Sequence, residues 1–335
     1  MLAAIRREMS LGQDALAEKL GVAPKTLQAW EQGRNPLIHL SYSRLRLLLR
    51  ALLAGGAPAE LVRTLEIALS ADDILSGLGV HDPNLHPLGL VVPDRATTEL
   101  VAWPLTGVVP RRLRGTTASL QIPTGQQDEV IANLRQAADA AGNDEQSAML
   151  RRQAVFFIAD HDSARGHSAA WTESQIHDAT RVADLRQWSP AWPVARSAAV
   201  QAALAGNLEP LHRFVEEGLA SEETQQANLT YWAYWVGEYQ TPWESDAAMV
   251  RAGTGGWSGE RLLGSLLDGV VGAPYRELCV HSLWALGHAR RALVTEPRWA
   301  TRISGAVESA TLDDSLTPLA RRRLEQIHYF VGSTA

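Results

Sequence analysis

The sequence predicts an all-α protein with a small N-terminal helical domain and a large C-terminal helical region. Two observations support this prediction. Residues 1–75 divide into five helical segments separated by glycine, proline and polar turns. From residue 127 onward, apolar residues recur at helical spacing and breaks are short. The 335 residues suit two or three domains, which we place at 1–75, 76–126 (a connector) and 127–335.

The most informative stretch is residues 12–36, which predicts two short helices joined by a tight turn. The first helix covers 13–20, with Leu16, Ala17 and Leu20 on one face, and Gly21 follows where a helix ends with positive φ. Pro24 suits the first position of a second helix, 24–32, because its missing N–H costs nothing there. Gly33 and the Asn35-Pro36 pair end that helix.

This stretch resembles the helix-turn-helix of the Cro/phage-repressor (xenobiotic response element, XRE) family. The resemblance covers about residues 1–70 and rests on these residues: Gln13, Leu16-Ala17, Leu20-Gly21-Val22, Leu27, Trp30-Glu31, Gly33 and Arg34. It implies a domain that places helix 24–32 in the major groove of DNA. We call this N-terminal domain, residues 1–75, the head. A head followed by about ten helices also resembles, in architecture only, the peptide-sensing regulators of Gram-positive quorum systems.

The resemblance implies a role for each matching residue. Gln13 is expected to bond a phosphate, and Arg34 and Asn35 are expected to lie near phosphates. Pro24, Lys25 and Gln28 are expected to face bases, with Thr26 beside the backbone and Ala29 also turned outward. Glu31 is expected to bond inside the domain, and Trp30 to pack in its core. Two departures are Gly12, where the family usually has a serine cap, and Pro24, which cannot donate a hydrogen bond to a base.

Three further helices complete the predicted head. Leu2, Ile5 and Met9 mark the first, with Arg6 and Arg7 on its outer side. The next covers 42–53, capped by Ser41 or Ser43. The last begins at Pro58 and ends before residue 70.

The connector at 76–126 contains six prolines between residues 83 and 123, so we expect no long helix there. Short strands are expected at 88–92, 99–102 and 105–109. Arg111, Arg112 and Arg114 form a basic cluster with two interpretations. It is either an auxiliary phosphate contact, or else a solvated linker or a contact with the acidic body.

The C-terminal region predicts antiparallel helices joined by short turns. The expected ranges are 127–141, 144–160, 171–187, 191–205, 208–218, 222–238, 258–271, 275–293, 297–310 and 316–331. An α-solenoid of the tetratricopeptide or HEAT kind and an irregular bundle both fit this series, and no fixed repeat selects between them.

Charge is unevenly distributed. Residues 1–54 carry eight Arg and Lys against four Asp and Glu, a net charge of +4, so the remainder carries −10 of the total of −6. A basic head on an acidic body restricts polyanion contact to the head. The single cysteine, Cys279, excludes an internal disulfide, and no apolar run is long enough for a membrane span. We expect a soluble, cytoplasmic protein, and the Ala-, Arg- and Gly-rich composition is typical of a high-GC bacterium such as an actinomycete.

Aromatic and histidine clusters in the C-terminal region have alternative interpretations. Trp232 and Trp235 share a helix face, and Tyr239 follows at i+4, so these three either line a ligand or interface site or belong to a helix–helix core. His161, His167 and His177 lie near carboxylates, and the His161-Asp162 pair weakly resembles metal-dependent phosphohydrolases, but the remaining ligand pairs are absent. His281 and His288 suit a polar seam better than a zinc site. We predict no metal and no cofactor.

Together these features predict a sequence-specific transcriptional regulator. We expect it to bind double-stranded DNA as a homodimer on an inverted-repeat operator. The helical body would serve dimerisation and would bind a peptide, small-molecule or protein effector. The alternative is an antitoxin-like or phage-derived interaction protein that uses the head for autoregulation. No nucleophile–base arrangement, dinucleotide fingerprint or phosphate-binding loop predicts an enzyme.

Overall fold

The computed structural model describes residues 1–116, 123–182, 184–239, 243, 245–251, 254–313 and 315–332. These residues are helices, turns and loops, with no strand among them. The chain forms two compact units: unit 1 comprises Met1–Val80 and Ala96–Asn133, and unit 2 comprises His81–Arg95 and Leu134–Ala335. The predicted all-α class is confirmed, whereas the division at 1–75, 76–126 and 127–335 stays a prediction.

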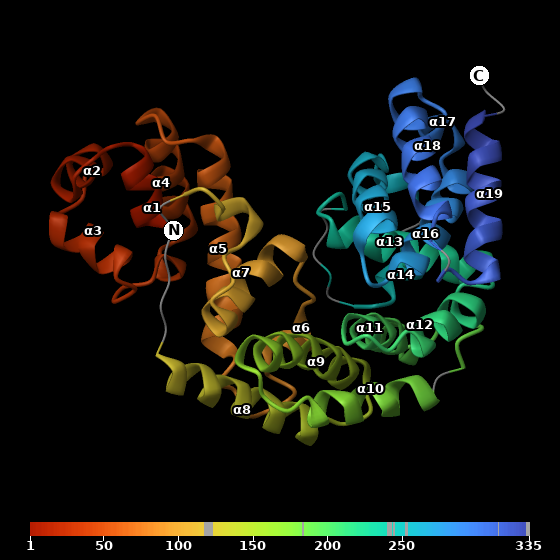
Figure 1. Cartoon of the computed structure of the whole chain (residues 1–335). Coiled ribbons are helices and arrows are strands. Elements are labelled where there is room, and N and C mark those ends of the chain that lie inside the picture. The colour runs from red at the N-terminus through yellow and green to blue at the C-terminus, as the bar shows by residue number, and fades with distance from the viewer. Residues whose placement is uncertain are drawn as a thin grey trace. The chain divides into compact units, whose positions relative to one another are not determined.

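Unit 1 begins with the five predicted helices (Figure 1). They are α1 (Leu2–Glu8), α2 (Gln13–Leu20), α3 (Pro24–Glu31), α4 (Tyr42–Ala54) and α5 (Ala59–Gly77), with a 3₁₀ turn, η1 (Leu37–His39), before α4. Helix α3 packs on α1 and α2, while α5 packs on α1 and α4. Ile5, Leu16, Leu27 and Leu52 are fully buried between them, so the apolar faces read from the sequence form one core.

Helix α5 is longer than predicted. We expected it to end before Ser70, because the polar residues Ser70, Asp72 and Asp73 resemble a turn. Instead Ala71 and Ile74 are 2% and 4% exposed, and they continue the buried stripe through the last two turns of the helix. A helical period that persists across polar residues outweighs their turn preference.

The strands expected in the connector are wrong, because these residues form helices. Residues 88–92 lie largely in α6 (Pro87–Leu90), which begins at a proline and is capped by the His86 ring accepting from the Leu88 N–H at 3.2 Å. Residues 99–102 and the first two residues of 105–109 lie in α7 (Arg95–Thr106), in which every residue from Leu100 to Leu105 is buried, and 107–109 follow it as a loop. A helix buried on all sides has no polar face, so its apolar run looks like that of a buried strand.

The remainder of unit 1 is η2 (Arg111–Leu113) and the first part of α8 (Thr124–Ala140), in which the boundary between the units falls. Pro104 lies in the last turn of α7, where its carbonyl accepts from Gln127 Nε2 at 2.6 Å. Arg111 pairs with Glu99 at 3.3 Å and Arg112 with Glu60 at 3.9 Å. The two arginines thus make contacts inside unit 1, and the predicted phosphate contact stays a prediction.

The predicted C-terminal helices form, but the helix expected at 171–187 ends at Val182 and the one expected at 275–293 is divided into two. The helices of unit 2 after α8 are α9 (Glu145–Arg165), α10 (Ala170–Val182), α11 (Ala191–Leu204), α12 (Glu209–Arg213), α13 (Glu222–Trp235), α14 (Ala248–Arg251), α15 (Glu260–Gly272), α16 (Arg276–Ala289), α17 (Arg291–Val294), α18 (Pro297–Thr311) and α19 (Pro318–Gly332). Helix α12 continues as a π-helical turn, η3 (Phe214–Gly218), and a 3₁₀ turn, η4 (Thr254–Gly256), precedes α15.

Most helices in unit 2 pack on their neighbours along the chain, as short turns require. Helix α11 packs on α9 and α10, and α16 packs on α13, α15 and α19 (Figure 1). The largest buried residues include Trp192 and Phe214, whose ring centroids are 5.1 Å apart. The solenoid and bundle alternatives both stay predictions.

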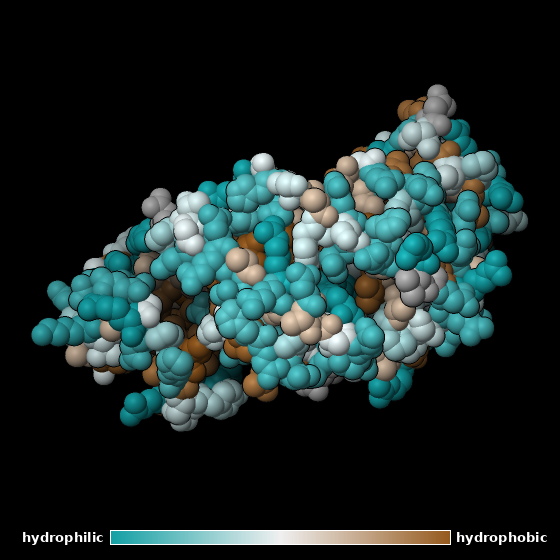
Figure 2. Space-filling model, turned by 90° about the horizontal axis from the view of Figure 1, so that it is seen from below, coloured by the Kyte–Doolittle hydropathy of each residue, from teal (hydrophilic) through white to brown (hydrophobic). Residues whose placement is uncertain are grey.

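One face of the surface is mainly hydrophilic, and the helices of the described residues are too short or too polar to cross a membrane. Figure 2 shows one face, on which hydrophilic side chains predominate and hydrophobic ones form small patches. In the described part of the chain, no helix combines the length and apolarity needed to cross a membrane.

Candidate DNA-binding site

The turn between α2 and α3 forms as the sequence predicts. Gly21 has φ 63°, its N–H donates to Glu18 O at 3.0 Å, and the Val22 N–H donates to Ala17 O at 3.0 Å. These two bonds make a Schellman motif, which needs a left-handed residue at this position. Pro24 then stands at the first position of α3. Glycine and proline together fix how α3 leaves the turn.

A buried charge network holds α3 against α1 and α2. Arg6 Nε and Nη2 donate to the two carboxylate oxygens of Glu31 at 2.7 and 3.1 Å, and Gln13 Nε2 donates to Glu31 Oε2 at 2.7 Å. The Glu31 side chain is 5% exposed. This confirms the internal role expected for Glu31. Arg6 was expected on the outer side of α1, and that prediction is wrong because its guanidinium turns inward to neutralise Glu31.

The network changes the titration of its members. Burial acts to raise the pKa of Glu31, but the hydrogen bonds from Arg6 and Gln13, with the nearby arginine charges, outweigh it and lower that pKa below its ordinary value. The hydrogen bond to Glu31 raises the pKa of Arg6. Gln13 is the residue expected to bond a phosphate. One of its amide hydrogens is already committed to Glu31, so its phosphate role stays a prediction.

The outward face of α3 carries the other candidate residues. Pro24 and Lys25 are exposed, and Gln28 and Ala29 are half-buried. Lys25, Gln28 and Ala29 are spaced i, i+3, i+4, so they share one face. Among the described residues the side chains of Lys25 and Gln28 have no hydrogen-bond partner, which leaves their donors available to a ligand.

Three more predicted residues flank that face. Thr26, next to Lys25, is half-buried, and Arg34 and Asn35 are exposed just beyond the end of the helix. Gly33, with φ 70°, turns the chain there. The predicted weak cap is also present: Gly12 stands at the N-cap of α2 without a side-chain hydrogen bond. Ser41 holds the corresponding position of α4, but its Oγ contacts Ser43 Oγ at 3.2 Å and no backbone N–H.

Trp30 was expected to be a core residue, but it is only half-buried, with its Nε1 enclosed and without a partner in the described part of the chain. We therefore expect Trp30→Ala to cost about 2 kcal/mol, below the range for a fully buried tryptophan. Chemical denaturation of the full-length protein, monitored by helical circular dichroism, measures this. A loss above about 4 kcal/mol would contradict the partial burial.

A comparison with known families agrees with this geometry. A family model described as helix-turn-helix matches residues 2–52. This stretch is a DNA-binding domain of the helix-turn-helix class. It is of the XRE/Cro type, and a large helical region follows it. No curated protein and no solved structure matches the chain.

The candidate aromatic residues of unit 2 have separate surroundings. Trp232 is 8% exposed, and its ring centroid lies 6.3 Å from that of Tyr275. The ring centroids of Trp235 and Phe156 are 6.3 Å apart, and those of Tyr239 and Trp243 are 6.5 Å apart. Trp232 therefore belongs to the core. A ligand or interface role for Trp232, Trp235 and Tyr239 stays a prediction.

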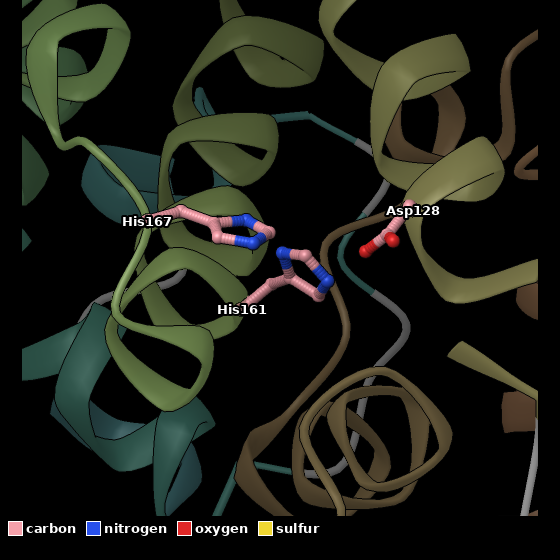
Figure 3. A group of neighbouring side chains, drawn as sticks. All are labelled: Asp128, His161 and His167. Atoms are coloured by element: carbon pink, nitrogen blue, oxygen red, sulfur yellow. The ribbon is translucent and has the colours of Figure 1, made fainter. Parts of the chain in front are cut away.

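The histidine pairs also have local partners. Figure 3 shows His161 and His167 of unit 2, with ring centroids 5.5 Å apart; Asp128, drawn with them, belongs to unit 1. Asp162, adjacent to His161, accepts from Arg135 at 2.6 Å. His281 is buried beside Trp284, and burial lowers its pKa to about 4, so the ring is neutral at pH 7.

Two buried arginines in unit 2 were not recognised from the sequence. Arg152 forms a two-bond ion pair with Asp246 at 2.6 and 3.0 Å. Arg196 donates to Asn228 Oδ1 at 2.7 Å and lies 4.7 Å from the centre of the Tyr231 ring. Burial lowers the pKa of Arg196 to about 10, which still leaves it charged at neutral pH. An arginine between apolar helical positions was the only signal in the sequence for either.

Proposed function

We propose that this protein is a sequence-specific transcriptional regulator that places α3 in the major groove of its operator. The observation that supports this most directly is the α3 face with Lys25 and Gln28, whose donors have no internal partner in the described chain. Lysine and glutamine are side chains that read guanine and adenine edges. Exposed Arg34 and Asn35 suit the flanking phosphates. Pro24 donates nothing, so we expect a short list of direct base contacts.

The proposal includes a homodimer and an inverted-repeat operator. A single α3 reads only a few base pairs, so specific affinity at physiological salt needs two half-sites about one helical turn apart or a multiple of it. The DNA-binding head is a small part of the chain, so most residues are left for other roles. We assign dimerisation and effector or partner binding to the helical region after the head. We propose no catalytic activity and no cofactor.

The test of specific binding is a selection of sequences from random duplex DNA by the full-length protein. We expect a palindromic motif with half-sites spaced as above. A non-palindromic single site would overturn the dimer. Failure to enrich any motif, with only weak salt-sensitive binding, would overturn the proposal of a transcriptional regulator and would favour the alternative of an interaction protein.

We expect Lys25→Ala and Gln28→Ala each to weaken binding to the selected operator by about 1–3 kcal/mol and to relax the base preference at one position. Arg63→Ala is the control, because it also removes one positive charge from an exposed helix position, on α5. Fluorescence anisotropy at fixed salt measures all three. Unchanged affinity and unchanged preference in both α3 variants would contradict the docking of this helix.

A further inference from the structure

Helices α9, α10 and α11 line a cavity of about 600 Å³ in unit 2 that is partly open to solvent. Its volume falls in the range of small-molecule sites. Several of the side chains that line the cavity are small. Ala148 on α9, Ala179 on α10, and Ala191 and Ser197 on α11 all line it. Helices at ordinary spacing need larger side chains to fill the space between them.

Part of the cavity lining is apolar. Val155, Ile176 and Ala198 line it and are buried, and together with Ala202 they form a small hydrophobic cluster separate from the main core. Val194 adds a half-buried aliphatic surface. None of the described residues that line the cavity is aromatic. This part of the lining therefore suits a flexible aliphatic chain better than a flat ring.

Arginine side chains from α9 give the cavity a cationic wall. Arg152 lines it, but its guanidinium is already neutralised by the two-bond pair with Asp246, and its side chain is 3% exposed. Arg151 also lines the cavity and is half-buried. Its Nη1 donates to Ala141 O at 2.9 Å and Gly142 O at 2.6 Å.

Within the part of the chain that the structure describes, no carboxylate balances the charge of Arg151. No acidic side chain of the described chain forms an ion pair with it. The two carbonyl bonds fix the guanidinium in place and use only one of its three nitrogens, so its remaining donors are available to an anion. Asp178, the acidic residue of the lining, is exposed and so is well hydrated.

We infer that this cavity binds a small amphipathic carboxylic acid, with the aliphatic chain against Val155, Ile176 and Ala198 and the carboxylate at Arg151. The binding site does not depend on DNA recognition; only its use as an effector site rests on the proposed function. The aliphatic side chains of the lining offer contacts to an apolar body. A ligand with an aliphatic body makes them, and an anionic group also pairs the guanidinium.

The test uses three ten-carbon probes below their micellar concentrations: decanoate, decanol and decylamine. Isothermal titration calorimetry on the full-length protein measures each. We expect saturable binding of decanoate, weaker binding of decanol, and the weakest binding of decylamine. Decylamine binding as tightly as decanoate would overturn the anionic ligand, and absence of saturable binding by all three would overturn the site.

Variants test the role of Arg151 and the role of the apolar lining separately. Arg151→Gln should weaken decanoate at least tenfold and leave decanol unchanged, while Arg151→Lys should retain most decanoate affinity. Val194→Phe and Ala198→Leu should each fill the cavity and abolish binding of both probes. Leu204→Phe, on an exposed position of α11, is the matched control. Circular dichroism identifies any variant that fails to fold. If one of the two cavity-filling variants fails to fold, the other still provides the test.

The result would also separate the site from the proposed function. Decanoate bound in the cavity without any change in operator affinity leaves the site intact and removes its effector role. Unchanged decanoate binding in Arg151→Gln and in both folded filling variants would place the ligand elsewhere and overturn the inference.

Discussion

Asp246→Ala is expected to lower the free energy of unfolding of unit 2 by about 3–5 kcal/mol, the usual cost of removing one partner of a buried ion pair. Both side chains of the Arg152–Asp246 pair are 3% exposed. Asp246 also accepts from Trp243 Nε1 at 2.9 Å. Burial acts to lower the pKa of Arg152, but the Asp246 charge outweighs it and the pKa is raised. Because arginine keeps its proton in proteins, Arg152 stays charged in the variant and loses the carboxylate that is hydrogen-bonded to it.

Guanidinium denaturation of the full-length protein, followed by circular dichroism, measures this loss. Asp268→Ala is the control, because Asp268 is an exposed acidic residue on α15 and its removal should change stability by less than about 0.5 kcal/mol. The double variant Arg152→Met with Asp246→Ala should recover most of the loss, since it removes the orphaned charge as well. A single Asp246→Ala variant as stable as the control would show that water or another group neutralises Arg152.

How well the sequence predicted each feature depended on the range of the interactions behind it. The α2–α3 turn depends on Gly21 and Pro24, whose backbone preferences act within a few residues, and both helices were predicted to within a residue. The Arg152–Asp246 pair joins residues 94 apart in the sequence. Nothing local marks Asp246 as the partner, so the pair could not be predicted.

Burial explains the main errors in the fold. Helix α7 is apolar from Leu100 to Leu105, and an apolar run of this length does not reveal whether it is a helix or a strand. Trp30 is the opposite case. A tryptophan at a helical core position suggests complete burial, yet Trp30 is only half-buried, while Leu27 of the same helix is fully buried. Local pattern predicts the face of a helix, but tertiary packing determines how deeply it is buried.

The candidate site was predicted as a set of surface positions, whereas the network that orients it was only partly foreseen. Glu31 was expected inside the domain on the basis of resemblance. The sequence alone does not show that Arg6, on a different helix, is its partner. The cavity between α9, α10 and α11 was not predicted either, because it results from small residues on three helices meeting in space.

Glu31→Gln is expected to destabilise the DNA-binding head by about 3 kcal/mol. Operator binding should weaken as well, because only the folded fraction of the head binds DNA. The variant leaves Arg6, whose side chain is only 17% exposed, without a counter-charge. It also exchanges a charged acceptor of Gln13 for a neutral one, which weakens that hydrogen bond. Because the network ties α1, α2 and α3 together, the orientation of α3 depends on it.

The same residue predicts a dependence of stability on pH. The pKa of Glu31 in the folded head is below its ordinary value, so the carboxylate contributes stability that is fully present above the ordinary glutamate pKa. That contribution is lost as the pH falls through the lower pKa of the folded state. Thermal unfolding of the wild type and of Glu31→Gln should therefore differ most near neutral pH, and the difference should shrink in acid. Glu18→Gln, at an exposed position of α2, is the control. A difference between wild type and Glu31→Gln that is the same at pH 7 and in acid would show that the Glu31 charge does not stabilise the head.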